Sequence, residues 1–326
     1  ATSDDFSNAL KFHSSNGTTS LLASMVSAPI NQIVDTLKLV RKFKNTVFSG
    51  CRLLGAHLEG PYLSYKNIGA HLKEYLCTPD RDSYQFIKEN SDVIVNVTLS
   101  PELPGSLQMI EDLKIMGVII SGGHDDAVDY EIMRAISAGM TNVTHIFCVS
   151  SSINSRNGKR YTGLTEIGLI DESLTVELIA DNHHLTPELV TLAYRCKGAH
   201  KACIVSDCLR AGGMPANGMV YALGPHHEKN VQQVVVDGDV AVLPDRSRYA
   251  GSIQPLGRMV KNLVEDCGIP LKDAVCMASY TPSKIINAAD FIGSIALGKM
   301  ADFCIMDKNL NVIKTIVQGR IVFDKF

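Results

Sequence analysis

Short apolar runs alternate with helix-length segments along the first two thirds of the chain. Seven of these runs predict β-strands, at residues 18–24, 52–60, 93–100, 117–124, 141–147, 174–181 and 202–207. Between them, stretches such as 30–43 and 78–90 begin with a Pro or a Thr/Asp pair, as helices commonly do. This alternation predicts a parallel α/β fold.

Seven strand–helix units come close to the eight of a closed (β/α)8 barrel. The 326 residues fit one barrel of about 250 residues plus an appendage better than two equal domains. We therefore expect a TIM-like barrel over residues 1–292, with a β-hairpin inserted near 231–243 that turns at Asp237-Gly238. Residues 293–326 alternate apolar and polar positions, which predicts strands of a small β-sandwich domain outside the barrel.

Composition excludes several classes of protein. With 45% hydrophobic residues and a net charge of -3, the chain can bury a large core and offers no basic surface for nucleic acid. No apolar run approaches the roughly 18 residues of a membrane-spanning helix, and the first residues do not resemble a signal peptide. Nine cysteines without a C-x-x-C pair predict reduced thiols and a cytoplasmic protein.

Ionisable residues stand at or just after the carboxyl ends of five predicted strands: Glu59, His124, His145, His184 and Asp207. These ends share one face of a parallel barrel, the face that carries active sites. Two imidazoles and one carboxylate form a ligand set that catalytic Zn²⁺ uses. A single His or Glu at such a position is more often structural, and Asp207 could merely cap a loop. Five on successive ends favour a catalytic site, whereas His226 and His227 are interpreted as a surface turn.

Longer motifs extend this pattern along nearly the whole chain. They are HLEGPY (57–62), GAH (69–71), GGHDDA (122–127), THIF (144–147), IADNHH (179–184), SDCLRAGGMP (206–215) and YAGSIQPL (249–256). In order and spacing they resemble the N-acetylglucosamine-6-phosphate deacetylases of the amidohydrolase superfamily. HLEGP followed by GAH is far more specific than any single pair of histidines. The segment 281–307 resembles the superfamily ending, which leads into the β-sandwich.

The resemblance implies a metal-dependent hydrolase. It implies one divalent ion per subunit, with Zn²⁺ as the first choice and Fe²⁺, Co²⁺ or Mn²⁺ as alternatives, held by Glu59, His124 and His145. Asp207 of SDC matches the residue that takes a proton from metal-activated water and returns it to the leaving amine. A carboxylate can serve as base and acid in turn in this way.

Five substrate contacts follow from the same resemblance: His71, His184, Arg156, Cys148 and Val149. Arg156 matches the residue that holds the 6-phosphate, which a guanidinium can bind with two parallel hydrogen bonds. Arg160 is its alternative, because both lie in the basic stretch NSRNGKR. Cys148 and Val149 stand where the family has Asn and Ala.

The implied reaction is hydrolysis of N-acetylglucosamine 6-phosphate to glucosamine 6-phosphate and acetate, in a homodimer. The alternatives are the galactosamine epimer, another amide, or a catalytically lapsed paralogue that binds a sugar phosphate, which Cys148 favours. The family's N-terminal sandwich strands and first barrel strand have no counterpart in this sequence. We therefore expect roughly 40 to 60 further residues before Ala1 in the complete protein.

Overall fold

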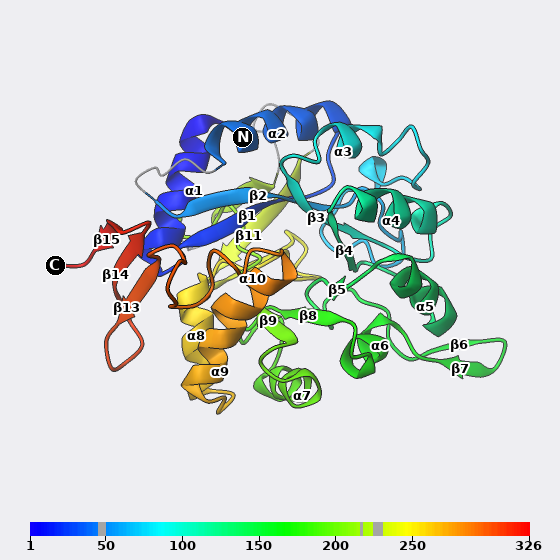
Figure 1. Ribbon diagram of the computed structural model, residues 1–326. Coiled ribbons are helices and arrows are strands. Elements are labelled where there is room, and N and C mark those ends of the chain that lie inside the picture. The colour runs from blue at the N-terminus through cyan, green and yellow to red at the C-terminus, as the bar shows by residue number, and fades with distance from the viewer. Residues whose placement is uncertain (45–49, 216–217, 224–230) are drawn as a thin grey trace.

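A curled parallel sheet forms the centre of the protein, described here by a computed structural model that covers residues 1–44, 50–215, 218–223 and 231–326 (Figure 1). His226 and His227 lie outside these described residues. Within them the sheet has seven strands in the order β1-β2-β3-β4-β5-β8-β9, each parallel to its neighbours. The strands are β1 (Ser20–Met25), β2 (Arg52–Glu59), β3 (Ile94–Leu99), β4 (Ile119–Gly122), β5 (Asn142–Val143), β8 (Thr175–Leu178) and β9 (Ala202–Ile204). The seven predicted strands and the TIM-like barrel class are confirmed.

Helices cover the outer face of this sheet (Figure 1). They are α2 (Ile30–Phe43), α3 (Gln85–Glu89), α4 (Ser106–Ile115), α5 (Asp129–Ala138), α6 (Leu164–Ile170), α7 (Pro187–Lys197), α8 (Leu256–Glu265), α9 (Leu271–Val275) and α10 (Thr281–Ile285). α2 shows why they pack there: Ile33, Leu37 and Val40 repeat every three or four residues and are buried against the sheet. A short 3₁₀ turn, η1 (Lys73–Tyr75), lies in the long connection after β2.

One local feature differs from the predicted strands, and two others were not predicted. β5 ends at Val143, earlier than expected, because the chain turns through left-handed conformations at His145 and Phe147. α9 continues through a π-helical segment, η2 (Cys276–Tyr280), into α10, so the chain stays helical at Pro282. The polar N-terminal stretch forms α1 (Ser3–Ser15), which opens with a capping box between Thr2 and Asp5.

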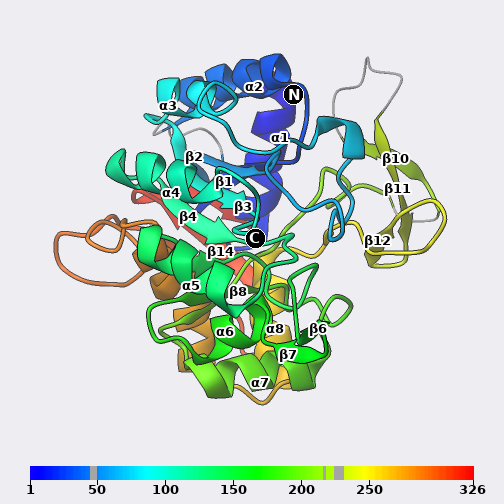
Figure 2. The same cartoon turned by 90° about the vertical axis from the view of Figure 1, so that its right-hand side faces the viewer.

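Two smaller antiparallel sheets are formed by segments that connect the strands and helices of the barrel. The predicted hairpin is present as β11 (Gln232–Asp237) and β12 (Val240–Val242). A third strand, β10 (Val220–Leu223), pairs with β11, and this three-stranded sheet lies to one side of the barrel (Figure 2). β6 (Asn154–Arg156) and β7 (Lys159–Tyr161) form a second hairpin, over residues for which no strand was predicted.

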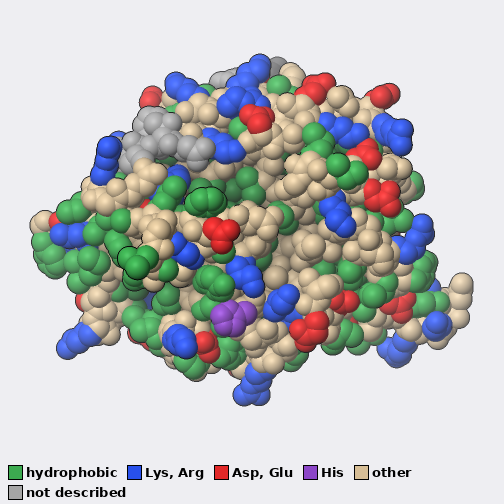
Figure 3. Space-filling view, viewed as in Figure 1, with side chains coloured by type: hydrophobic (Ala, Val, Ile, Leu, Met, Phe, Trp, Pro, Cys, Tyr) green, Lys and Arg blue, Asp and Glu red, His purple; other side chains and the backbone are tan. Residues whose placement is uncertain are grey.

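The C-terminal residues form an antiparallel sheet of β13 (Phe303–Met306), β14 (Val312–Val317) and β15 (Arg320–Asp324). This sheet lies beside α1, where Thr315 donates a hydrogen bond to the carbonyl of Ser14. Hydrophobic side chains gather over it in the space-filling view (Figure 3). The boundary between residues 1–292 and 293–326 stays a prediction. In the described part of the chain, no helix has the length and apolar character needed to cross a membrane.

Candidate active site

Three residues from different strand ends meet at one carboxylate oxygen. Glu59 is the last residue of β2, His124 follows β4, and His145 follows β5. The Nε2 atoms of His124 and His145 lie 2.7 and 3.0 Å from Glu59 Oε1. All three side chains are buried. The parallel sheet therefore brings together the three residues that the sequence proposed as metal ligands.

The hydrogen-bond partners of Nδ1 in His124 and His145 fix which ring nitrogen carries the proton. His124 Nδ1 lies 2.9 Å from the carbonyl oxygen of Asn67, and His145 Nδ1 lies 3.1 Å from that of Cys148. A carbonyl oxygen can only accept a hydrogen bond, so both Nδ1 atoms must donate. In a neutral ring the Nε2 lone pair is therefore turned toward Glu59, the orientation that metal-ligating histidines adopt. Where no cation is bound, Nε2 carries a proton instead, and its hydrogen bond to Glu59 outweighs burial and raises the pKa of His145 to about 9.

His71 also reaches this cluster, with its proton on the other ring nitrogen. Its Nε2 lies 3.6 Å from Glu59 Oε1, and Glu59, His71 and His124 could hold a metal ion by position alone. However, the backbone N–H of Ser27 donates to His71 Nδ1 over 3.2 Å, so the neutral ring carries its proton on Nε2. This tautomer makes Nε2 a hydrogen-bond donor, which favours His145 over His71 as the third ligand.

The cluster fits a divalent cation. The Nε2 atoms of His124 and His145 lie 2.7 and 3.0 Å from one carboxylate oxygen, and a cation held by all three residues would replace the protons that otherwise make these contacts. Burial opposes ionisation of Glu59, but hydrogen bonds from His124 and His145 outweigh it and hold the pKa of this carboxyl well below its usual range. Nitrogen and carboxylate donors are suited to Zn²⁺ and related ions. The site therefore offers a divalent metal position.

Asp207 borders the same space from the end of β9. The backbone of Asp207 is left-handed, and two backbone hydrogen bonds with Ser252 hold it in place. The N–H of Ser252 donates to the Asp207 carbonyl, and the N–H of Leu209 donates to the Ser252 carbonyl. Burial raises the pKa of the Asp207 carboxyl to about 6, and the charge of Glu59 adds to the rise. His145 and His184 act in the opposite direction. A carboxyl with this pKa can exchange a proton near neutral pH.

The loop that carries Cys148 and Val149 is anchored by a residue without an assigned role in the sequence analysis. Asp125 is fully buried, and it accepts hydrogen bonds from the backbone N–H and the hydroxyl of Ser151. Its position directly after His124 was the available signal. By holding Ser151, Asp125 fixes the loop in which the Cys148 carbonyl contacts His145 Nδ1. Asp125 therefore supports the orientation of a proposed metal ligand.

His184 lies on the turn after β8 and is paired with a second carboxylate that was not singled out from the sequence. Its Nδ1 lies 2.8 Å from Asp181 Oδ2, and its ring packs against Tyr249 at 5.2 Å between ring centroids. His184 also influences the charge of Asp207. It therefore borders the same end of the barrel.

Arg156 has protein partners instead of a free guanidinium. It donates to the carbonyl of Asp126 over 2.8 Å and lies 3.4 Å from Glu131. It belongs to β6, opposite Lys159, whereas Arg160 pairs with Ser155. Residues next to each other on a strand point to opposite faces, so Arg156 and Arg160 lie on different faces of the hairpin.

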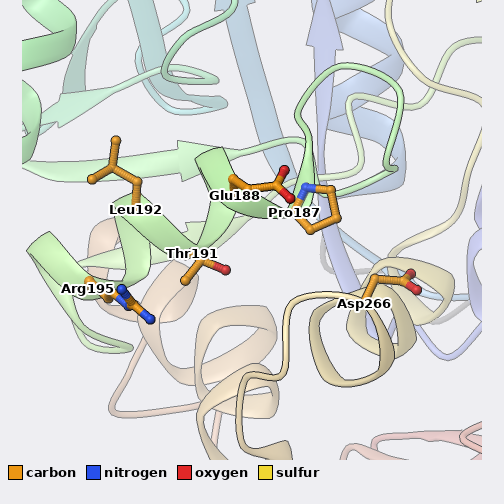
Figure 4. A pocket seen from close by; sticks show the side chains of 6 residues that line it. All are labelled: Pro187, Glu188, Thr191, Leu192, Arg195 and Asp266. Carbon is orange, nitrogen blue, oxygen red and sulfur yellow. The ribbon is translucent and has the colours of Figure 1, made fainter.

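A separate surface groove lies between α7 and the end of α8 (Figure 4). Its lining residues are Pro187, Glu188, Thr191, Leu192, Arg195 and Asp266. Asp266 accepts a hydrogen bond from Asn182, in the turn that carries His184, over 2.7 Å. The groove is therefore connected to that turn through Asp266. None of the predicted site residues is among its lining residues.

The strand-end site and the barrel define the class of protein. The chain belongs to the amidohydrolase family, whose sequence model matches residues 6–322. It is 33% identical to the N-acetylglucosamine-6-phosphate deacetylase of Vibrio furnissii, over 99% of this chain and 78% of that protein. It is 30% identical to the N-acetylgalactosamine-6-phosphate deacetylase of Escherichia coli O157:H7, over 94% and 78%.

A solved structure supports the same relationship. The N-acetyl-D-glucosamine-6-phosphate deacetylase of Mycobacterium smegmatis, as a variant in complex with N-acetyl-D-glucosamine-6-phosphate, superimposes with a TM-score of 0.87 at 28% identity. The match covers 98% of this chain and 81% of that chain. The family that the motifs suggested is thereby confirmed.

Proposed function

We propose that this protein hydrolyses the N-acetyl group of N-acetylglucosamine 6-phosphate and releases glucosamine 6-phosphate and acetate. The observation that carries the proposal is the convergence of Glu59, His124 and His145 at one buried point, with Asp207 beside it. The similarity to deacetylases of this substrate supports the choice of sugar.

In the proposed mechanism Glu59, His124 and His145 would hold one Zn²⁺ ion, whose contribution would be to acidify a water molecule and polarise the amide carbonyl. Asp207 accepts a proton from the attacking water and returns it to the nitrogen of the leaving amine. One water is consumed, the carbon–nitrogen bond breaks, and the products are a carboxylate and an amine. His71 Nε2–H is available to donate to an oxygen of the substrate.

An acetate-release assay with both epimeric sugar phosphates and with unphosphorylated N-acetylglucosamine tests the substrate. We expect the gluco 6-phosphate to be hydrolysed with the highest kcat/KM and the unphosphorylated sugar to react poorly. Metal analysis of the same sample should give one zinc per chain, and chelation should abolish turnover. Acetate release from the galacto epimer alone would favour the alternative substrate. No release from any of them would favour the lapsed paralogue.

The role of Asp207 predicts the effect of Asp207→Asn. The variant should keep its fold and its metal but lose about three to four orders of magnitude in kcat, because the proton acceptor is removed and no ligand is. In the unmodified protein, kcat/KM should fall as pH drops through about 6, where the Asp207 carboxyl takes up its proton. Near-normal turnover of Asp207→Asn would refute this role.

We also propose that the protein is a cytoplasmic homodimer. The dimer rests on the family resemblance, and the nine free cysteines support a reducing compartment. Light scattering on the purified protein measures the mass directly. A monomer at working concentration would contradict the dimer.

A further inference from the structure

The turn after β8 is built around one buried carboxylate. Asp181 is 1% exposed and accepts three hydrogen bonds: from the backbone N–H groups of His183 and His184 and, over 2.8 Å, from the ring of His184. Asn182 takes a left-handed conformation that folds the chain back onto Asp181. Gln254 donates to the Asp181 carbonyl over 3.0 Å, so the turn is also fixed from the opposite side.

These contacts determine the state of the His184 ring. The hydrogen bonds to Asp181 outweigh its burial and lower its pKa to about 2, so this carboxylate stays ionised and can only accept. The proton of a neutral His184 ring must then be on Nδ1. Among the described residues, His184 Nε2 has no hydrogen-bond partner, although the side chain is only 8% exposed.

We propose that Asp181 is a positioning residue that holds His184 with its proton on Nδ1 and presents the Nε2 lone pair to a hydroxyl group of the sugar substrate. The identity of that substrate rests on the proposed function. Nδ1 faces Asp181, and Nε2 lies on the other side of the ring. His184 lies near enough to Asp207 to lower its pKa when the ring is protonated, and the ring of Tyr249 lies 5.2 Å from that of His184, tilted by 45°. Asp181 therefore acts on the reaction only through His184.

The state of the ring can be measured without substrate. Long-range ¹H–¹⁵N correlation spectra of the labelled protein, recorded well above the ordinary histidine pKa, report the tautomer of each neutral imidazole. The signal that disappears in His184→Gln belongs to His184. We expect its proton on Nδ1 in the unmodified protein and on Nε2 in Asp181→Asn. The asparagine oxygen can still accept from the backbone while its amide nitrogen faces the ring as a donor.

Kinetics then test whether the tautomer matters. Asp181→Asn should lower kcat/KM about 10- to 100-fold with unchanged metal content, because the substrate loses a correctly oriented acceptor. The double variant Asp181→Asn/His184→Gln should be no worse than His184→Gln alone. Asp266→Asn is a matched control, since Asp266 contacts Asn182 in the same turn but not His184, and it should keep normal kinetics.

Two results would overturn the inference. One is a proton on Nε2 of His184 in the unmodified protein, a measurement that needs no variant to fold. The other is additive losses in the double variant, which would show that Asp181 acts by a route other than His184. Failure of the proposed function is distinguishable from both, because absence of acetate release would leave the spectroscopic result standing.

Discussion

Two backbone carbonyls and one glycine set the geometry around Glu59. The carbonyls of Asn67 and Cys148 orient the rings of His124 and His145. Gly69 has a left-handed φ of 62°, and a Cβ at this position would stand 2.9 Å from Cε1 of His124. Only glycine therefore allows the GAH segment to pass this close to a proposed ligand.

Gly69→Ala should weaken metal binding. The added methyl group pushes the His124 ring out of place, and displaced supporting contacts typically cost about 10- to 100-fold in metal affinity. Zinc affinity measured by competition with a chromophoric chelator checks this. Gly117→Ala is the matched control: Gly117 has φ 80° and nothing within 4 Å of an added Cβ. It should cost similar backbone strain without changing the affinity. Equal affinities in the two variants would argue against the steric role of Gly69.

The sequence could locate the proposed ligands but not their orientation. Glu59, His124 and His145 were predictable, because the ends of parallel strands converge whatever the loops do. Their tautomers depend on carbonyls at Asn67 and Cys148, which belong to loops whose paths no periodic pattern describes. Asp125 and Asp181 were overlooked for a related reason: their partners are backbone N–H groups and a neighbouring hydroxyl or imidazole, which only the folded turn assembles.

At the scale of elements, the β6–β7 hairpin separates the two candidate phosphate ligands, Arg156 and Arg160. Its turn is Asn157-Gly158, with φ of 52° and 77°, a pair that favours tight hairpins and could have been recognised in the sequence. Because the hairpin alternates faces, Arg156 and Arg160 cannot both point the same way. Arg156 is the one whose guanidinium contacts Asp126, two residues after His124.

Arg156→Ala should therefore raise KM for the sugar phosphate about 10- to 100-fold, the effect of losing a charge-assisted hydrogen bond worth about 1.5–3 kcal/mol. The value of kcat should change little, because the phosphate is remote from the broken bond. Arg160→Ala, from the opposite face, should leave KM near normal. Steady-state kinetics of the two variants measure the difference. A larger effect from Arg160→Ala would reverse the assignment.

At the scale of the whole molecule, one buried ion pair joins the barrel to the C-terminal sheet. Arg52, the first residue of β2, binds Asp302 with two hydrogen bonds of 3.0 and 3.1 Å, and the two side chains are 2% and 6% exposed. Asp302 lies just before β13 and also accepts from the N–H of Gln318, just after β14. These residues are 250 positions apart, so no local pattern predicts the contact.

Asp302→Ala should destabilise the protein by about 3–5 kcal/mol, because it leaves the Arg52 guanidinium buried without a counter-ion. Urea unfolding measures the loss. Asp92→Ala is the control, since Asp92 forms a similar pair with Arg41 at the surface, and such pairs contribute about 1 kcal/mol or less. Hydrogen exchange should then locate the weakening. If the pair holds the sheet to the barrel, β13–β15 will exchange faster than β3 and β4 in Asp302→Ala. Uniformly faster exchange would mean that the pair stabilises the barrel itself.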